Sequence, residues 1–175
     1  MSFINRFLDW NTIDPSSTID GFDVPIKEPK VNRDLSYEQK KHWYSYKFQG
    51  PALRYLIVTH MKSNEIIWCS KAYPGATSEI GIAETELGPL MLPEERMLGD
   101  RLFRNSDYFT TATSHSCGYT YCVDSLRSAV ERRIRVLRTF EVLKQEWRGI
   151  TLESHQFHRE CMVVVAQLTN FYFNK

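Results

Sequence analysis

Residues 94–103 read EERMLGDRLF, and this stretch decides how the middle of the chain folds. Charged residues give way to an apolar pair, and a glycine then precedes Asp100. The pattern predicts a short central strand over 96–100 that ends in a carboxylate. A buried carboxylate loses hydration at a large cost in free energy unless a positive group compensates it. Two interpretations are open at this point: Gly-Asp forms an ordinary turn, or Asp100 is a ligand of a metal ion.

Length and composition indicate one globular domain. The chain has 175 residues, of which 42% are hydrophobic and 25% charged, and this length allows a substantial core. The sequence contains no apolar run of the roughly 20 residues that cross a bilayer. The beginning, MSFINRFLDWNTIDPSS, has neither a basic leader nor a long apolar segment. We therefore expect a soluble intracellular protein with no membrane partner.

The cysteines are irregularly spaced and form no CxxC pair: Cys69, Cys117, Cys122 and Cys161. Zinc binding by Cys117, Cys122 and His115 is conceivable, but free thiols in a reducing compartment are favoured.

The net charge of +1 indicates no global attraction to nucleic acid, yet residues 127–149 form an arginine-rich segment. A basic helix can contact phosphates even in a nearly neutral chain. A solvated helix face with ion pairs one turn apart is the alternative, and the segment taken alone favours it.

Periodicity predicts alternating strands and helices. From Asp124 onward the spacing of Val130, Ile134 and Leu137 predicts an amphipathic helix, and Ser78 is a plausible N-cap of an earlier one. The expected elements are strands over 17–26, 43–61 (two strands broken at Gly50–Pro51), 64–75, 96–100 and 108–112, a loop over 27–41, and helices over 78–92, from 124 on and over 155–175. This order predicts an α/β fold with a central mixed β-sheet flanked by helices.

Three acidic residues fall where such a fold places functional groups. Asp20 lies in the first strand, Asp100 ends the central strand, and Glu131 projects from the later helix. Sites in open α/β sheets gather at one end of the sheet. Carboxylates there can hold Mg²⁺, and two such ions about 4 Å apart promote phosphodiester displacement. The alternative is three unrelated surface acids among the 21 of the chain.

Six segments in register resemble motifs of the DDE superfamily of endonucleases derived from Harbinger-type transposases. They are DGFDVPIKEP (20–29), DLSYEQKKHWYSYKFQGPALRYLIVTH (34–60), IIWCSKAYPGATSE (66–79), MLGDRLF (97–103), RSAVERRIRVLRTFEVLKQEWRG (127–149) and HQFHRECMVVVAQLTNF (155–171). The resemblance implies an RNase H-like fold over residues 18–175, after a short extension over 1–17. It also implies a DNA substrate, a nuclear location and carboxylates that hold Mg²⁺ or Mn²⁺.

The same resemblance assigns roles to individual residues. The family's D-G aspartate falls on Asp20, its L-G-D aspartate on Asp100 and its V-E-R glutamate on Glu131, and these three would be catalytic metal ligands. A further metal ligand, the aspartate that closes Y-P-G-S-x-x-D, falls on Glu79, where the acid is one methylene longer. Arg127 and Arg138 match basic positions of the same helix and would contact DNA phosphates.

The implied activity is metal-dependent hydrolysis of DNA phosphodiester bonds, with one ion activating water and another neutralising the leaving 3′ oxygen. Phosphoryl transfer needs no side-chain nucleophile, so the histidines require no catalytic role: His42, His60, His155 and His158.

The alternative is a domesticated, catalytically inactive module that binds DNA or protein. Family members carry a helical DNA-binding region before the first aspartate, whereas 19 residues precede Asp20 here, and a separate DNA-binding partner protein would fill that role. An unrelated small-molecule enzyme has little support, since there is no phosphate-cradling glycine loop or nucleophile motif.

Overall fold

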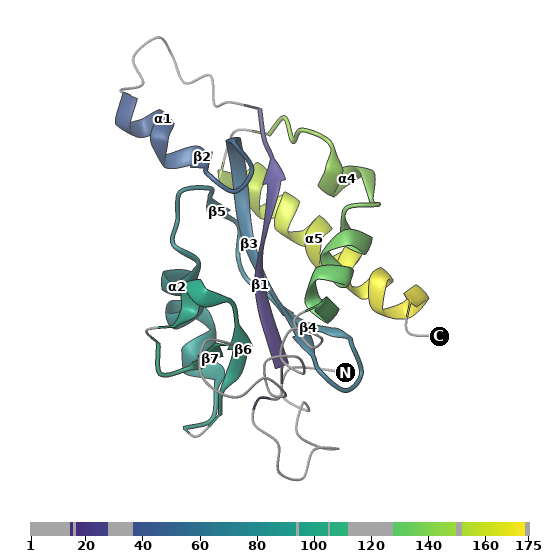
Figure 1. Cartoon of the computed structure of the whole chain (residues 1–175). Helices are drawn as coiled ribbons and strands as arrows, with labels where there is room; N and C mark the ends of the chain where they lie inside the picture. Colours follow the sequence, from purple (N-terminus) through teal and green to yellow (C-terminus); the bar gives the residue numbers. More distant parts are fainter. Residues whose placement is uncertain are drawn as a thin grey trace.

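The computed structural model describes residues 15, 17–27, 37–93, 95–104, 106–111, 128–149 and 152–173. Figure 1 shows strands β1 and β3 at the centre, with α2 on one side and α4 and α5 on the other. The expected α/β fold, a mixed sheet flanked by helices, is confirmed.

One sheet contains the strands of the described residues. Their bounds are β1 Ser17–Pro25, β2 Tyr44–Ser45, β3 Gly50–His60, β4 Ile66–Cys69, β5 Tyr73–Pro74, β6 Met97–Gly99 and β7 Phe109–Thr111. The order is β2-β3-β1-β6-β7, and β4 and β5 also pair with β3. β1 runs antiparallel to β3 from Ser17↔His60 to Pro25↔Ala52. β6 runs parallel to β1, and β7 runs parallel to β6. The central strand β1 therefore joins an antiparallel half to a parallel half.

Of the predicted helix starts, the cap at Ser78 is confirmed, whereas the C-terminal helix begins three residues before the expected residue 155. The Ser78 side chain accepts a hydrogen bond from the Gly81 amide and caps α2, as predicted. The helical elements are α1 Tyr37–Trp43, α2 Glu79–Ile82 with its π-helical and 3-10 continuations Ala83–Leu87 and Gly88–Leu90, a 3-10 turn Arg101–Phe103, a helix over 128–137, α4 Glu141–Lys144 and α5 Leu152–Phe173.

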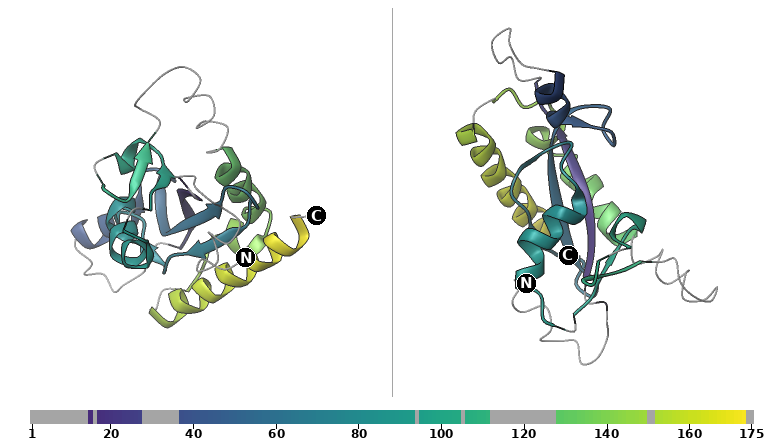
Figure 2. Two further views of the ribbon diagram at one scale, coloured as in Figure 1. Left: turned by 90° about the horizontal axis from the view of Figure 1, so that it is seen from below. Right: turned by 90° about the vertical axis from the view of Figure 1, so that its left-hand side faces the viewer.

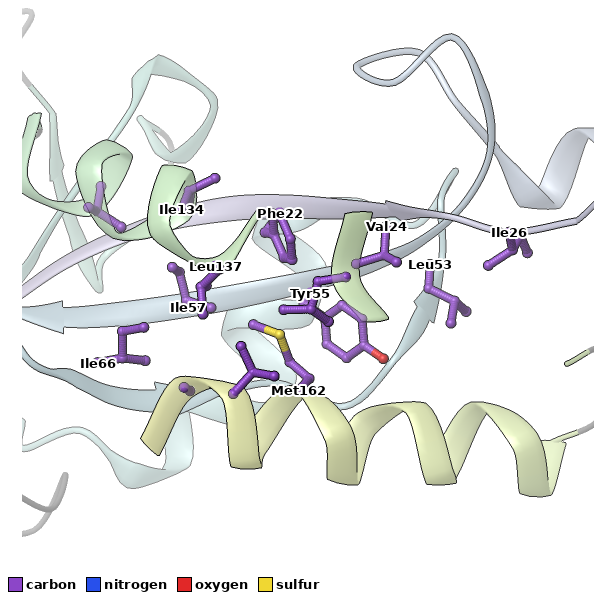
Figure 3. Packing of buried hydrophobic residues seen from close by; sticks show 14 residues of the cluster. Phe22, Val24, Ile26, Leu53, Tyr55, Ile57, Ile66, Ile134, Leu137 and Met162 are labelled. Carbon is purple, nitrogen blue, oxygen red and sulfur yellow. The ribbon is translucent and has the colours of Figure 1, made fainter. Parts of the chain in front are cut away.

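Apolar side chains bury both faces of the sheet, because successive residues of a strand point to opposite faces. On one face, Phe22 and Tyr55 pack against Leu137 and Met162, which come from helix 128–137 and α5 (Figure 3). On the other face, Leu56 packs in a second cluster under α2. The left view of Figure 2 likewise shows α5 and α2 on opposite sides of the central strands.

Three further expected boundaries are wrong. The loop expected over 27–41 ends early, because α1 begins at Tyr37, where helix-forming Glu, Gln and Lys residues follow one another. The break expected at Gly50–Pro51 is a turn over 46–49, with Gln49 at a φ of 63°. The single strand expected over 64–75 is split into β4 and β5, since the Leu56 amide donates to the Ser70 hydroxyl instead of to a strand carbonyl.

Candidate functional site

Two predicted acids follow the junction of β1 and β6. In the described residues this pairing consists of Thr18 opposite Leu98, and Asp20 and Asp100 each lie two residues further along their strands. The backbone at Asp100 is still extended, with φ −77° and ψ −176°. Strand alternation therefore directs both acids to the face of the sheet that Phe22 occupies.

Asp20 has a positive partner that the sequence did not reveal. Its Oδ1 accepts hydrogen bonds from the Gly21 amide at 2.7 Å and from the Lys47 ammonium at 3.2 Å. Lys47 also donates to the Gly21 carbonyl at 2.8 Å. Burial opposes the charge of Lys47, but attraction to Asp20 and Glu79 outweighs burial and raises the pKa of Lys47. The charge of Asp20 is thus compensated within the chain.

Glu79 is buried against the backbone of β1. A Cβ atom at Gly21 would overlap its carboxylate. Its Oε1 lies 3.8 Å from both Lys47 Nζ and Arg54 Nε, whereas its buried Oε2 has no hydrogen-bond partner among the described residues. Burial raises the pKa of Glu79 despite the two nearby cations. This side chain therefore has one buried oxygen without a hydrogen-bond partner among the described residues.

A buried ion pair lies beside Glu79. Arg54 donates from Nε to Asp23 Oδ1 at 2.9 Å and from Nη2 to Asp23 Oδ2 at 3.0 Å. The Ser45 hydroxyl also donates to Asp23 Oδ2, at 2.6 Å. Asp23 and Arg54 are direct neighbours in the β1–β3 register. The bidentate pair joins β1, β3 and the start of the 46–49 turn.

Asp100 performs the turn role that its sequence indicates. Its Oδ1 accepts the Leu102 amide at 2.8 Å and caps the 3-10 turn that follows β6. The turn interpretation is confirmed. The metal-ligand interpretation stays a prediction, since this cap engages one carboxylate oxygen.

The remaining predicted site residues lie on or beside helix 128–137. Glu131 is exposed, and the Arg138 guanidinium lies 5.5 Å from the centre of the Phe22 ring, on the face that Asp20 shares. Arg127 lies outside the described residues, as do Cys117, Cys122 and His115. In the part of the chain that the structure describes, no three histidine, cysteine, aspartate or glutamate side chains group closely enough to hold a metal ion.

A cationic cavity of about 370 Å³ extends from Lys47 to the segment after helix 128–137. Its charged lining includes three cations, Lys47, Arg138 and Lys144, and one acid, Asp23. Because Arg54 already neutralises Asp23, the cavity presents a net positive surface next to Asp20.

The family model described as DDE superfamily endonuclease matches residues 19–170. The chain belongs to this family. Neither a curated protein nor a solved structure matches the chain. The match confirms the superfamily named from the six segments, and it includes all four predicted acids. Nuclease or transposase-type function is what this membership suggests.

Within this member of the DDE superfamily, Lys47 and Arg54 are charged residues that the sequence analysis did not single out. Arg54 interrupts the otherwise apolar run ALRYLIV, and a charge inside such a run is a signal for a buried partner. Lys47 carries no comparable signal, because it lies in a polar, aromatic stretch.

The structure also places the described histidines and cysteines that the sequence analysis singled out. His60, His155 and His158 are buried, whereas His42 is exposed. Cys69 and Cys161 are free thiols. Among the described residues, no helix is both long and apolar enough to cross a membrane.

Proposed function

We propose that this chain is a metal-dependent DNA nuclease of the Harbinger type, built on an RNase H-like fold. The sheet supports the fold assignment, because Asp20 lies within β1 and Asp100 directly follows β6, and these two strands join the antiparallel half of the sheet to the parallel half. Ligand sites of open α/β sheets lie at such switch points, beyond the carboxyl ends of the strands.

The observation that carries the proposal is that two carboxylates already share one cation. Lys47 Nζ lies 3.2 Å from Asp20 and 3.8 Å from Glu79. The free Oε2 of Glu79 is a hard oxygen donor of the kind that Mg²⁺ and Mn²⁺ take. The donor chemistry therefore fits a divalent ion: Asp20 and Glu79 already share a cation, and Asp100 and Glu131 would have to approach them for the four predicted ligands to hold the ion together.

The chemistry that divalent ions supply when bound is a water of lowered pKa and neutralisation of charge at the leaving 3′ oxygen. The chain supplies position and charge. β1 and β6 fix Asp20 and Asp100 on adjacent strands, while Arg127 and Arg138 would hold DNA phosphates. Phosphoryl transfer relies on such positioning and on electrostatic stabilisation.

A second candidate function is a catalytically inactive module of the same fold that binds DNA or protein. The specific observation in its favour is again Lys47, since its ammonium compensates Asp20 without any metal ion. The exposed position of Glu131 on helix 128–137 points the same way.

Calorimetric titration with Mg²⁺ and Mn²⁺ separates the two functions. We expect wild-type protein to bind the ions and Asp100→Asn to lose binding, with parallel loss of plasmid nicking. Asp107→Asn is the matched control, because Asp107 is an exposed aspartate outside the predicted set. Absence of divalent binding by wild-type protein at millimolar concentration, with DNA present, rejects the nuclease and leaves the inactive module.

The proposal includes the remaining expectations from the sequence. Residues 18–175 form the nuclease unit after a short extension over 1–17, the protein acts in the nucleus, and a separate partner protein supplies further DNA contacts.

A further inference from the structure

The turn over 46–49 is anchored by buried polar contacts. Its flanking strands pair at Tyr44↔Pro51 and Ser45↔Gly50. The Ser45 hydroxyl accepts the Phe48 amide at 3.1 Å and donates to buried Asp23 at 2.6 Å. The Gln49 amide bonds to the Ser45 carbonyl at 2.8 Å. These contacts fix the conformation of the turn.

The tip of this fixed turn presents aromatic rings to solvent. Tyr46 is 69% exposed and Phe48 is 43% exposed. Between them, Lys47 reaches back to Asp20 and Gly21. Phe48 and Lys47 both line the cationic cavity. An exposed ring and a cation therefore lie together at the edge of the predicted catalytic site.

The opposite wall of the cavity supplies more positive charge. Arg138 and Lys144 line it together with Leu143. Lys144 lies 3.5 Å from Glu141, but both side chains are more than 60% exposed, so solvent screens this pair and Lys144 stays available to an anion.

We propose that the 46–49 turn and residues 138–144 form a binding groove for a single DNA strand, an inference that rests on the proposed function. A base stacks on Phe48, while backbone phosphates lie against Lys47, Arg138 and Lys144. Proteins bind single strands by this combination of a basic groove and exposed aromatic rings. Since Lys47 contacts Asp20, a strand in the groove would pass directly beside the predicted catalytic acid.

The test is fluorescence anisotropy of a labelled 12-nucleotide oligothymidine, titrated with the full chain in EDTA at low salt. Phe48→Ala should weaken binding about tenfold, whereas Phe48→Trp should retain it. Lys144→Gln should lower the slope of log K against log salt by about 0.7.

The matched controls are Phe171→Ala, which removes a 66% exposed ring at the far end of α5, and Lys62→Gln, in the turn after β3. Thermal melts verify folding of each variant.

The outcomes separate this inference from the proposed function, because binding in EDTA requires no catalysis. Wild-type affinity in both Phe48→Ala and Lys144→Gln overturns the groove, even if plasmid nicking by the metal-loaded protein proceeds. An equal loss in Phe171→Ala also overturns it. Specific loss in the two groove variants supports the groove even if nicking is absent, in which case the nuclease function alone fails. Competition with a poly-glutamate peptide tests for acidic protein segments as the alternative ligand. If the peptide, at a charge concentration equal to that of the oligonucleotide, displaces it equally from wild type and from Phe48→Ala, the groove binds acidic segments and the stacking role of Phe48 is overturned.

Discussion

The carboxylate of Glu79 lies directly on the backbone of Gly21, where any side chain would overlap its oxygen atoms. None of the described glycines has a positive φ, so Gly21 is needed for the space that it leaves and not for its backbone conformation. The glycine that follows Asp20 thus allows an acid from α2 to approach β1 closely. This relationship gives the Asp-Gly pair of the sequence a physical reason.

Substitution of Gly21 by alanine should therefore destabilise the fold. The added methyl group must displace the buried Glu79 side chain, and such overpacking costs about 1–3 kcal/mol. Urea unfolding measures the loss. In the double variant Gly21→Ala/Glu79→Ala the cost of the methyl group should largely disappear. If the losses of unfolding free energy in Gly21→Ala and Glu79→Ala simply add up in the double variant, the contact between Gly21 and Glu79 is contradicted.

Removal of the Lys47 charge should strengthen divalent-ion binding. The Lys47 ammonium lies 3.2 Å from Asp20 and 3.8 Å from Glu79. In Lys47→Gln a divalent ion no longer competes with this ammonium for the two carboxylates. We expect roughly tenfold higher affinity for Mn²⁺ by calorimetry. Lys62→Gln is the control for loss of one exposed lysine. Equal or weaker Mn²⁺ affinity in Lys47→Gln would show that the ammonium does not occupy the ion's position.

Loss of Arg54 should destabilise the protein more than a surface substitution does. Arg54→Met leaves Asp23, whose side chain is 2% exposed, as an unpaired buried charge. Breaking a buried ion pair in this way costs about 3–5 kcal/mol. The double variant Asp23→Leu/Arg54→Met, which removes both charges, should recover much of this loss. A loss below about 1 kcal/mol in the single variant would be evidence against a buried, unscreened pair.

Stability should fall as the pH falls from 6.5 to 4. Burial lowers the pKa of His158 to about 4, although the nearby Val142 backbone acts in the opposite direction. The unfolded chain takes up a proton near pH 6.5, whereas the folded chain does so only near pH 4, so this contribution to stability is complete above pH 6.5. At pH 4 it should be smaller by about 3 kcal/mol.

Urea unfolding at several pH values tests this dependence. The Tyr55 hydroxyl lies 2.6 Å from His158 Nδ1 and forms a hydrogen bond whose direction depends on the tautomer of the imidazole. His158→Gln retains a side chain that can accept from or donate to this hydroxyl but cannot titrate, and it should flatten the pH dependence. A slope equal to that of wild type would assign the effect to another group, of which His155, whose pKa burial also lowers, is the first to examine.

Local patterns were sufficient to predict most of the elements. The apolar stripe of Val130, Ile134 and Leu137 is buried as its spacing indicates. Ser78 caps α2, and β6, Met97–Gly99, lies within the strand expected over 96–100. The helix α1 was missed, because its polar residues show no apolar periodicity and follow a proline-containing stretch.

The electrostatics of the site could not be predicted from the sequence alone. The sequence placed Asp20 in the first strand and Asp100 at the end of the central strand, as the structure has them. The partners of these acids depend on contacts between segments far apart in the chain. Arg54 meets Asp23 only through the β1–β3 register, and Lys47 reaches Asp20 only because the 46–49 turn folds back over β1.

The place of β1 in the sheet has a consequence for synthesis. β1 lies between β3 and β6, yet it precedes both along the chain, so a ribosome releases the central strand before either neighbour. Its apolar residues remain open to chaperones or to aggregation until β3 emerges. A nascent chain that has released β4 but not β6 can complete the antiparallel half, whose pairs are closer in sequence than those of β1 with β6. The antiparallel half is therefore the natural first unit of folding, and the acid pair of β1 and β6 is completed only afterwards.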